Sequence, residues 1–227
     1  MKGIDVSKWQ GDINWLKVKA SGVEFVIIKA GGSDAGFYED PKFAENYAGA
    51  HAAGLPIGVY YFVGPKCISY EDGVADANRL LAILDGRKLA FPAFMDIETT
   101  PVAERDGASW AALGFCETVK AAGYKCGIYA SDVFGFKDRL DIGKLGGIDK
   151  WVAKYSTSAP EYVTNYAIWQ YSDRGTVDGI NGLVDLNKAV KDYTAGDIPQ
   201  PQRSNSPEAA NLILDAIELL KKAVEML

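Results

Sequence analysis

"LAFPAFMDIETTP" occupies residues 89–101, where an apolar run ends in two acidic residues separated by a single isoleucine. Charged side chains are almost never buried unless they are paired or used. In a strand, residues i and i+2 point to the same face, about 6–7 Å apart, so Asp96 and Glu98 should face one side together and Ile97 the other. The stretch therefore predicts a buried strand that ends in two neighbouring carboxylates.

Seven further short apolar runs, rich in β-branched residues, occur along the chain, and the segments between the first five runs have helical periodicity. Several of the runs are apolar throughout, which is typical of strands buried on both faces. The later runs are closer together, with too few residues between them for full helices. The expected strands are residues 3–6, 25–30, 57–63, 91–97, 126–130, 151–155, 167–171 and 182–186.

Alternation of strands and helices predicts a parallel sheet, and eight strands favour a closed barrel. An open doubly wound sheet would need a glycine-rich phosphate loop after the first strand, but residues 3–15, GIDVSKWQGDINW, contain no GxGxxG pattern. The chain has 227 residues and 48% hydrophobic composition, enough for one large core. We therefore expect an α/β barrel that forms a single domain over residues 1–194.

Net charge and cysteine content exclude several classes of function. The formal charge is −6 and no basic stripe is present, which argues against binding of nucleic acid or of an anionic membrane surface. Cys67, Cys116 and Cys126 form no CxxC pair, and there is one histidine. We therefore expect reduced thiols rather than a zinc site or a disulfide framework.

The composition changes near residue 195. Residues 195–206 are rich in Pro, Gln, Ser and Asn and predict a linker. Residues 207–227 predict an amphipathic helix, with Ser206 as N-cap and Pro207 in the first turn. Its two apolar stripes favour a homo-oligomer formed through residues 207–227. Packing on the chain's own barrel, or the start of a further module, are the alternatives.

Acidic residues at the ends of other strands are the strongest functional signal. Active sites of parallel barrels lie at the carboxyl ends of the strands, where Asp5, Asp96, Glu98 and Asp185 should meet. Crowding should push the pKa values of Asp96 and Glu98 apart, leaving a proton donor beside an anion. That arrangement suits cleavage of a glycosidic bond, whereas a Mg²⁺ or Ca²⁺ site and solvated strand ends are the alternatives.

Aromatic residues accompany these acids. Aromatic rings at a polar cleft offer flat faces to sugar rings, although barrel strands also carry aromatic residues in their cores. Lys29 and Gln170 are further candidates for polar contacts. The candidate substrate-binding aromatic residues are Tyr60, Phe62, Tyr129, Trp151 and Tyr155.

Six stretches, in order and spacing, resemble the glycoside hydrolase family 25 lysozymes over residues 1–193. They are GIDVSKWQGDINW, GLPIGVYYF, FMDIE, GIYAS, WVAKY and IWQYSDRGTVDGINGLVDLN. The resemblance implies an irregular TIM-like (β/α)5(β)3 barrel. It also implies that Glu98 is the general acid, that Asp96 is its companion carboxylate, and that Asp5 and Asp185 complete an acidic floor. Tyr60, Tyr129 and Trp151 match aromatic cleft positions of that family.

The resemblance implies an N-acetylmuramidase that acts on peptidoglycan glycan strands without a cofactor or metal. It implies cleavage of the β-1,4 bond between N-acetylmuramic acid and N-acetylglucosamine, as in phage endolysins. The start of the chain has no signal-peptide pattern and no run of about 20 apolar residues. We therefore expect synthesis in the cytoplasm and action on the cell wall after holin-type release. A chitinase-like glycosidase and a non-catalytic glycan-binding barrel are the alternatives.

Two mechanistic questions stay open from the sequence. Retention could be assisted by the substrate's own N-acetyl group, oriented by Asp96, or could pass through a covalent aspartyl intermediate, and inversion is a further route. Gly31 and Gly32 stand where many relatives have a small residue followed by Glu-Gly, and because this loop borders the cleft, the resemblance does not fix the sugar preferences there.

Overall fold

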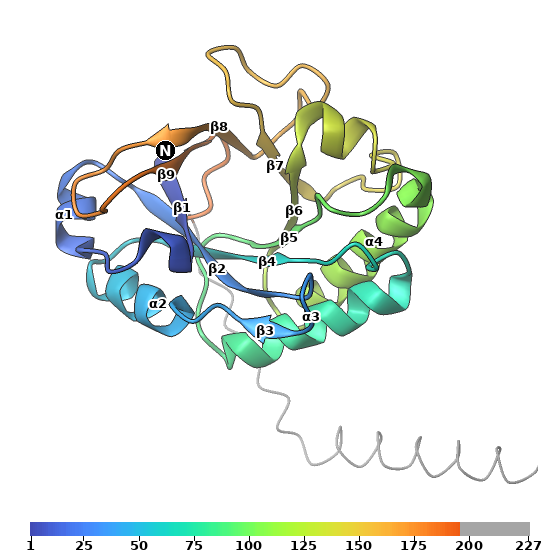
Figure 1. Cartoon of the computed structure of the whole chain (residues 1–227), viewed down its shortest axis with the longest axis horizontal. Helices are drawn as coiled ribbons and strands as arrows, with labels where there is room; N and C mark the ends of the chain where they lie inside the picture. The colour runs from blue at the N-terminus through green and yellow to red at the C-terminus, as the bar shows by residue number, and fades with distance from the viewer. Residues whose placement is uncertain (196–227) are drawn as a thin grey trace, which may run out of the picture.

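The computed structural model describes residues 1–195, and these form an α/β barrel (Figure 1). The predicted linker beyond residue 195 and the predicted helix 207–227 lie outside the described residues, so oligomerisation through that helix stays a prediction. No helix within residues 1–195 is both long enough and apolar enough to cross a membrane.

Eight strands close the barrel, as the sequence predicted. Around the sheet the order is β1-β9-β8-β7-β6-β5-β4-β2, and pairing of β1 with β2 completes the ring. A short strand, β3, is added at β2 and was not predicted. The bounds are β1 Lys2–Val6, β2 Phe25–Gly32, β3 Tyr38–Glu39, β4 Ile57–Phe62, β5 Ala93–Asp96, β6 Cys126–Ser131, β7 Asp149–Ala153, β8 Ile168–Gly175 and β9 Val184–Ala189.

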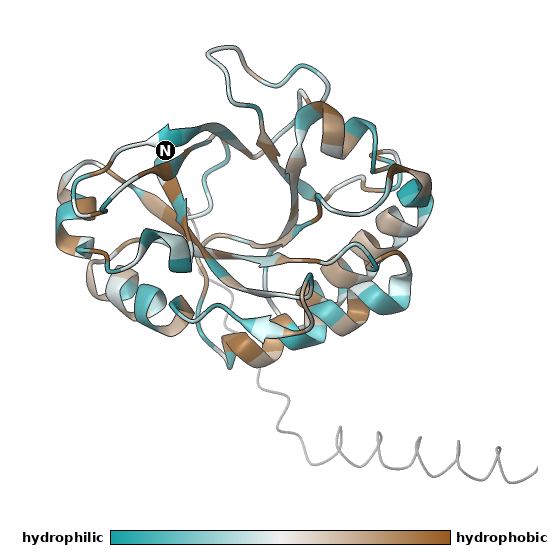
Figure 2. Ribbon diagram, viewed as in Figure 1, coloured by the Kyte–Doolittle hydropathy of each residue, from teal (hydrophilic) through white to brown (hydrophobic). Residues whose placement is uncertain are grey.

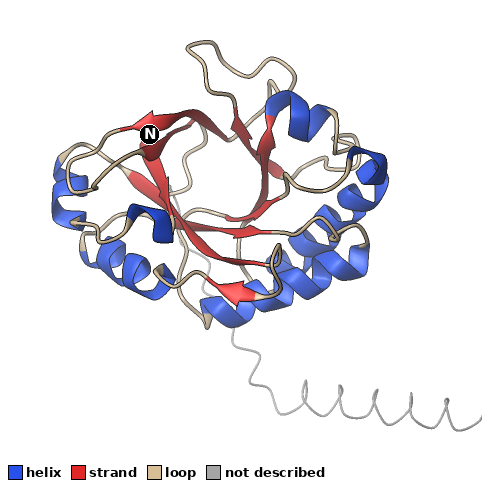
Figure 3. Ribbon diagram, viewed as in Figure 1, coloured by secondary structure: helices blue, strands red, loops and turns tan. Residues whose placement is uncertain are grey.

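Helices cover the outside of the first half of the barrel (Figure 3). The four α-helices are α1 Trp15–Ala20, α2 Phe43–Ala52, α3 Tyr70–Leu84 and α4 Arg105–Ala121. Short helices are η1 Lys8–Gln10, η2 Val102–Glu104 and η3 Asp132–Lys137, of which η3 is a π-helix. Between η3 and β9 the described chain contains strands and loops alone, in agreement with the helix-poor second half that the sequence predicted.

The last strand departs from the expected parallel sheet. β9 runs antiparallel to both of its neighbours, β1 and β8. The segment between β8 and β9 spans residues 176–183, which is too short for the crossover that a parallel connection requires. Several strand bounds also differ from the prediction. β5 begins two residues later and β7 two residues earlier than expected, while β8 extends to Gly175 and β9 to Ala189.

Residues of alternating strand positions form two separate cores. Val26 and Ile28 belong to the core between sheet and helices, whereas Phe25 and Ile27 belong to a second core. A period of two sends successive side chains to opposite faces of a sheet, so the second core fills the barrel interior. There Phe91 stacks on Phe25 with ring centroids 4.4 Å apart. Figure 2 shows hydrophobic colour along much of the barrel sheet and mixed colour on the outer helices.

Glycines let α3 and α4 pack with their backbones in close approach. A methyl group at Gly73 would overlap the carbonyl oxygen of Ala111, and one at Gly114 would overlap that of Tyr70. The position of the helix pair, with α3 against β2 and α4 against β5 and β6, therefore depends on the absence of side chains at these crossing points.

We expect Gly73→Ala to destabilise the protein. Forced separation of the helices should cost more than the gain in helix propensity, a net loss of about 1–2 kcal/mol, or roughly 2–8 °C in Tm. Thermal unfolding followed by circular dichroism measures this change. Gly146→Ala is the control, because its added methyl group would lie 4.0 Å from the carbonyl oxygen of Gly143, an ordinary van der Waals contact. An equal Tm for both variants would contradict the close approach.

Candidate active site

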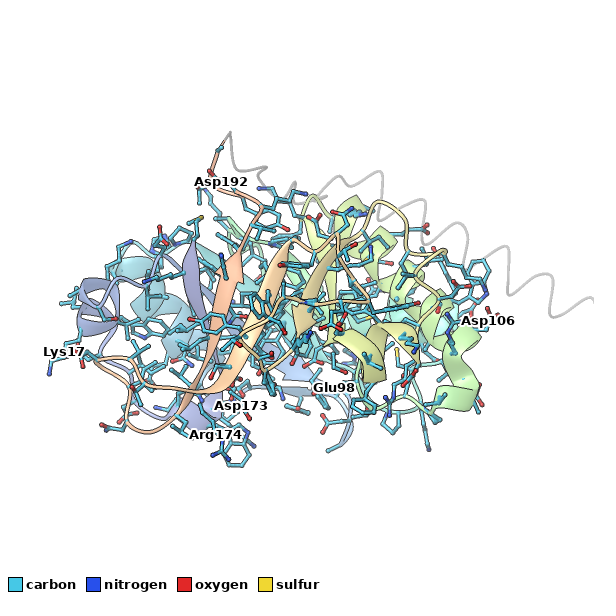
Figure 4. The ribbon with its side chains drawn as sticks, turned by 90° about the horizontal axis from the view of Figure 1, so that it is seen from above. Lys17, Glu98, Asp106, Asp173, Arg174 and Asp192 are labelled. Atoms are coloured by element: carbon cyan, nitrogen blue, oxygen red, sulfur yellow. The ribbon has the colours of Figure 1, made fainter. Side chains whose placement is uncertain are left out.

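The four predicted acids converge at one end of the barrel. Asp5 on β1 lies directly opposite Asp185 on β9 in the antiparallel register. Asp96 ends β5, level with Phe62 of β4 and Tyr129 of β6. Figure 4 places Glu98 on the same side of the molecule as Asp173 of β8, and Asp192 on the opposite side.

Asp185 reaches this end by a route that the sequence reasoning did not foresee. It lies near the start of β9, whereas the carboxyl ends of β1, β2 and β4–β8 form the rim. Because β9 is antiparallel, its beginning meets the carboxyl end of β1 and carries Asp185 to the rim.

The strand β5 delivers its acids by alternation. Phe94 belongs to the barrel interior, while Met95 and Ile97 pack in the outer core, as expected for Ile97. Asp96 therefore points inward above Phe94. Glu98 follows beyond the end of the strand and is exposed, in contrast to Asp96, which is 4% exposed. Two acids of similar chemistry thus occupy different environments.

Asp5 is held by two amide side chains. Its Oδ2 accepts hydrogen bonds from Asn187 Nδ2 at 2.6 Å and from Gln170 Nε2 at 2.9 Å. Asn187 Oδ1 in turn accepts from Trp151 Nε1 at 2.7 Å. Sequence reasoning missed Asn187, although its position two residues after Asp185 in the same strand indicates a shared face.

Gln170 connects this carboxylate to two tyrosines. Its Oε1 accepts from the hydroxyl groups of Tyr129 at 2.8 Å and of Tyr155 at 3.1 Å. Because both amide ends are engaged, the orientation of the Gln170 side chain is determined by its partners. The network therefore rigidifies the floor of the site from β6 to β8.

Burial and like charges raise the pKa values of the floor acids. Burial raises the pKa of Asp5 well above its ordinary value, and the charge of Asp185 adds to the effect. Burial also raises the pKa of Asp185, whereas its closeness to the carboxyl group of Asp5 lowers it. The pair is therefore suited to share one proton, held mainly by Asp5.

Asp96 is the most unusual group of the site. Burial raises its pKa well above the ordinary value, the charge of Glu98 raises it further, and Lys29 lowers it. Its Oδ1 is buried and has no hydrogen-bond partner within residues 1–195. A buried acceptor without a donor costs about 1–3 kcal/mol, so this oxygen has unused capacity to accept a hydrogen bond.

Glu98 stands in the open part of the site. Partial removal of water raises the pKa of its carboxyl group, whereas the cations Lys29 and Arg139 lower it. Lys29 Nζ lies 4.7 Å from the ring centroid of Phe62 and 5.7 Å from that of Tyr60. These contacts place Lys29 at the cleft, beside two candidate aromatic residues that are both half-buried.

The remaining candidate aromatic residues lie at different depths. Tyr155 is 53% exposed beyond the end of β7, whereas Tyr129 is 7% exposed. Trp151 is 1% exposed, which corrects the expectation that its ring faces the cleft. Rings of Tyr129 and Phe94 cover it, with centroids 4.4 Å and 5.3 Å away, because an inward position in mid-strand lies below the rim.

A second feature that the sequence reasoning missed is a pocket of about 490 Å³ beside Glu98. Val133 and Phe134 of η3 line it, together with Tyr155. Phe134, four residues after the predicted strand 126–130, was the available signal for exposed aromatic surface there, whereas the nearby Phe136 is buried. Separately, no group of three or more His, Cys, Asp or Glu side chains within the described range is arranged to hold a metal ion.

Comparison with known proteins places these features in context. The sequence profile of Glycosyl hydrolases family 25 matches residues 4–180. The chain is 30% identical to the autolytic lysozyme of Clostridium acetobutylicum over 228 residues, which cover 100% of this chain and 68% of that protein.

Solved structures agree with this match. The lysozyme of Streptomyces coelicolor superposes with a TM-score of 0.71 at 31% identity, covering 84% of this chain and 92% of that one. The autolysin LytC of Streptococcus pneumoniae, solved in complex with a synthetic peptidoglycan ligand, gives a TM-score of 0.69 at 27% identity. That match covers 82% of this chain and 46% of LytC.

We expect Asp96→Asn to raise stability at neutral pH. The raised pKa means that Asp96 destabilises the folded state progressively as the pH rises through that pKa, and has no such effect below the unfolded pKa of about 3.9. The gain should be about 1–2 kcal/mol near pH 7, or roughly 2–8 °C in Tm, and should vanish in acid.

Thermal unfolding between acid and neutral pH tests this expectation. Asp12→Asn is the control, since Asp12 is exposed and its pKa is lowered by Lys42, so that substitution should give no gain. A Tm of Asp96→Asn that stays at or below the wild-type value at every pH would show that Asp96 is not a strained group.

Proposed function

The chain belongs to glycosyl hydrolases family 25, and from that premise we propose that it cleaves the β-1,4 bond between N-acetylmuramic acid and N-acetylglucosamine in bacterial cell walls. Its relatives make it an enzyme of the lysozyme type that hydrolyses peptidoglycan. The observation that carries the finer proposal is the buried, unpartnered Oδ1 of Asp96 next to the exposed Glu98.

The unpartnered oxygen is suited to an N-acetylated sugar. Sugars of peptidoglycan carry an acetamido group at C2, whose N–H is a donor close to the anomeric carbon. A hydrogen bond from this N–H to Asp96 Oδ1 would satisfy the buried acceptor. It would also turn the acetamide carbonyl oxygen toward the anomeric carbon, where that oxygen can attack.

Roles for the two acids follow from their environments. Glu98, in contact with the open cleft, protonates the glycosidic oxygen as the bond breaks. A donor to Asp96 favours its ionised form, and the negative charge of Asp96 in turn favours the protonated form of Glu98. Attack by the acetamide oxygen expels the leaving sugar, and water, deprotonated by Glu98, then opens the cyclic intermediate with retained configuration.

The floor acids and aromatic residues complete the proposal. Asp185 supplies negative potential for the positive charge that develops at the anomeric carbon. Asp5 lies beside it and is positioned by the amides of Gln170 and Asn187. Tyr60, Phe62, Tyr155 and Lys29 are proposed to contact the sugars. Tyr129, Trp151 and Gln170 support that surface from beneath, through the hydrogen bonds and ring contacts already described.

Digestion of purified peptidoglycan tests the proposed bond. New reducing ends should carry muramic acid, and Glu98→Gln should lower the rate by about 10²–10⁴-fold, the usual contribution of a general acid. Mass analysis of borohydride-reduced products gives the answer. Glu104→Gln, an exposed glutamate of η2, should keep the full rate.

Other outcomes would assign other functions. Reducing ends of glucosamine, or cleaved peptide stems, would overturn the proposed bond specificity. Cleavage of chitin without cleavage of cell walls would favour a chitinase-like glycosidase, and binding without any product would favour a non-catalytic barrel.

Substrate assistance is tested with peptidoglycan whose N-acetyl groups have been removed. If the acetamide oxygen is the nucleophile, the wild-type enzyme should not cleave muramic acid linkages that have a free amine at C2, while re-acetylation of the same material should restore cleavage. Equal rates on both materials would instead point to direct attack by Asp96 or by water.

A further inference from the structure

The pocket of about 490 Å³ beside Glu98 has a composition different from that of the acidic floor. Of the four acids at the rim, Glu98 alone lines it, while Asp5, Asp96 and Asp185 do not. Its walls are η3 and the loop that follows β7. The volume lies within the range of about 300–1,000 Å³ that is usual for sites of small ligands.

The position of Glu98, the proposed general acid, indicates which sugar of the cleaved bond lies over the acidic floor and which lies in the pocket. Glu98 must reach the oxygen that joins two sugars. The sugar that becomes positively charged needs the negative charges of Asp96 and Asp185, so it lies over the floor. The sugar that leaves must then lie on the other side of Glu98, where the pocket is.

We propose that this pocket is the binding site for the leaving-group sugar, with Phe134 as its principal contact. The inference rests on the proposed function and extends it to the part of the glycan strand beyond the cleaved bond.

The surface chemistry of the pocket fits a pyranose ring. Phe134 is 72% exposed, Tyr155 53% and Val133 42%, an unusual concentration of apolar surface open to water. The polar groups on the same walls belong to Ser131, Asp132, Lys154 and Glu161. Flat apolar faces with a few polar groups at their edges match a sugar, which has apolar C–H faces and peripheral hydroxyl groups.

Both walls are held rigidly before any substrate arrives. The carboxylate of Asp132, at the start of η3, is 4% exposed and accepts backbone N–H groups of the β7–β8 loop. The donors are Glu161 at 2.8 Å, Val163 at 2.9 Å and Tyr162 at 3.2 Å. This carboxylate therefore ties the two walls of the pocket together.

Arg139 ties the same wall to the catalytic loop. Its Nε donates to the carbonyl oxygen of Thr100 at 2.9 Å, two residues after Glu98, and its NH1 group donates to the carbonyl oxygen of Phe134. The leaving-group platform and the general acid are thereby connected through one guanidinium group. Such preorganisation lowers the cost of aligning the glycosidic oxygen with the proton donor.

Two substrates that place the same sugars over the acidic floor but have different leaving groups distinguish binding of the leaving-group sugar from effects on catalysis over the floor. One is the tetrasaccharide of alternating N-acetylglucosamine and N-acetylmuramic acid, whose leaving group is a disaccharide. The other is the N-acetylglucosaminyl-N-acetylmuramyl fluoride, whose leaving group is a fluoride ion that cannot fill the pocket.

Phe134→Ala should lower kcat/KM on the tetrasaccharide by roughly tenfold, as expected for loss of a stacking contact, and should leave kcat/KM on the fluoride within about twofold. Phe134→Trp should retain activity on both substrates. Leu16→Ala is the control, since Leu16 is 74% exposed on α1 and does not line the pocket, and it should change neither rate. An equal loss on both substrates, or no loss on the tetrasaccharide, would overturn the assignment.

Binding to inactive enzyme gives an independent readout. In the Glu98→Gln background, Phe134→Ala should weaken binding of the intact tetrasaccharide by about the same factor, measured by titration calorimetry. Unchanged affinity would also overturn the assignment. If wild-type enzyme fails to cleave the tetrasaccharide but cleaves another glycan, the proposed function is wrong. The assignment of the pocket to a peptidoglycan sugar is then also wrong, because it rests on that function.

Discussion

The antiparallel pairing of β9 with β1 is the constraint on which the site depends. It closes the barrel and places Asp185 opposite Asp5 at the rim. It also brings Asn187 from β9 to the buried carboxylate of Asp5, where Gln170 of β8 completes the hydrogen bonding. A parallel last strand would have put the start of β9, and Asp185 with it, at the far end of the barrel.

The protein maintains buried acids at a cost in stability. Asp5 and Asp96 are each about 95% buried, and burial raises the pKa of both. The two carboxyl groups differ in hydrogen bonding, because Asp5 has two amide donors whereas Asp96 Oδ1 has none within residues 1–195. This difference separates a carboxylate that the protein positions by hydrogen bonds from one that keeps a free buried acceptor, which we propose receives a substrate group. Active sites commonly trade stability for function in this way.

Asp96 and Glu98, although only two residues apart, lie in different environments. Asp96 ends a buried strand, while Glu98 lies just past it, between the acidic floor and the pocket of η3. The change from buried to exposed over two residues occurs because β5 stops at Asp96, and the following loop is drawn toward η3 by Arg139. Glu98 is therefore located at the boundary between the acidic floor and a pocket with more apolar surface.

The sequence by itself determined the barrel, the eight strands and the four acids, because short apolar runs and carboxylates at their ends are local features. It also determined that the second half would contain few helices, since its segments are too short. The tertiary structure alone decided the direction of β9, the depth of Trp151, the role of Asn187 and the pocket formed by η3. Each of these depends on which residues from distant parts of the chain meet across the barrel, and no local pattern encodes that proximity.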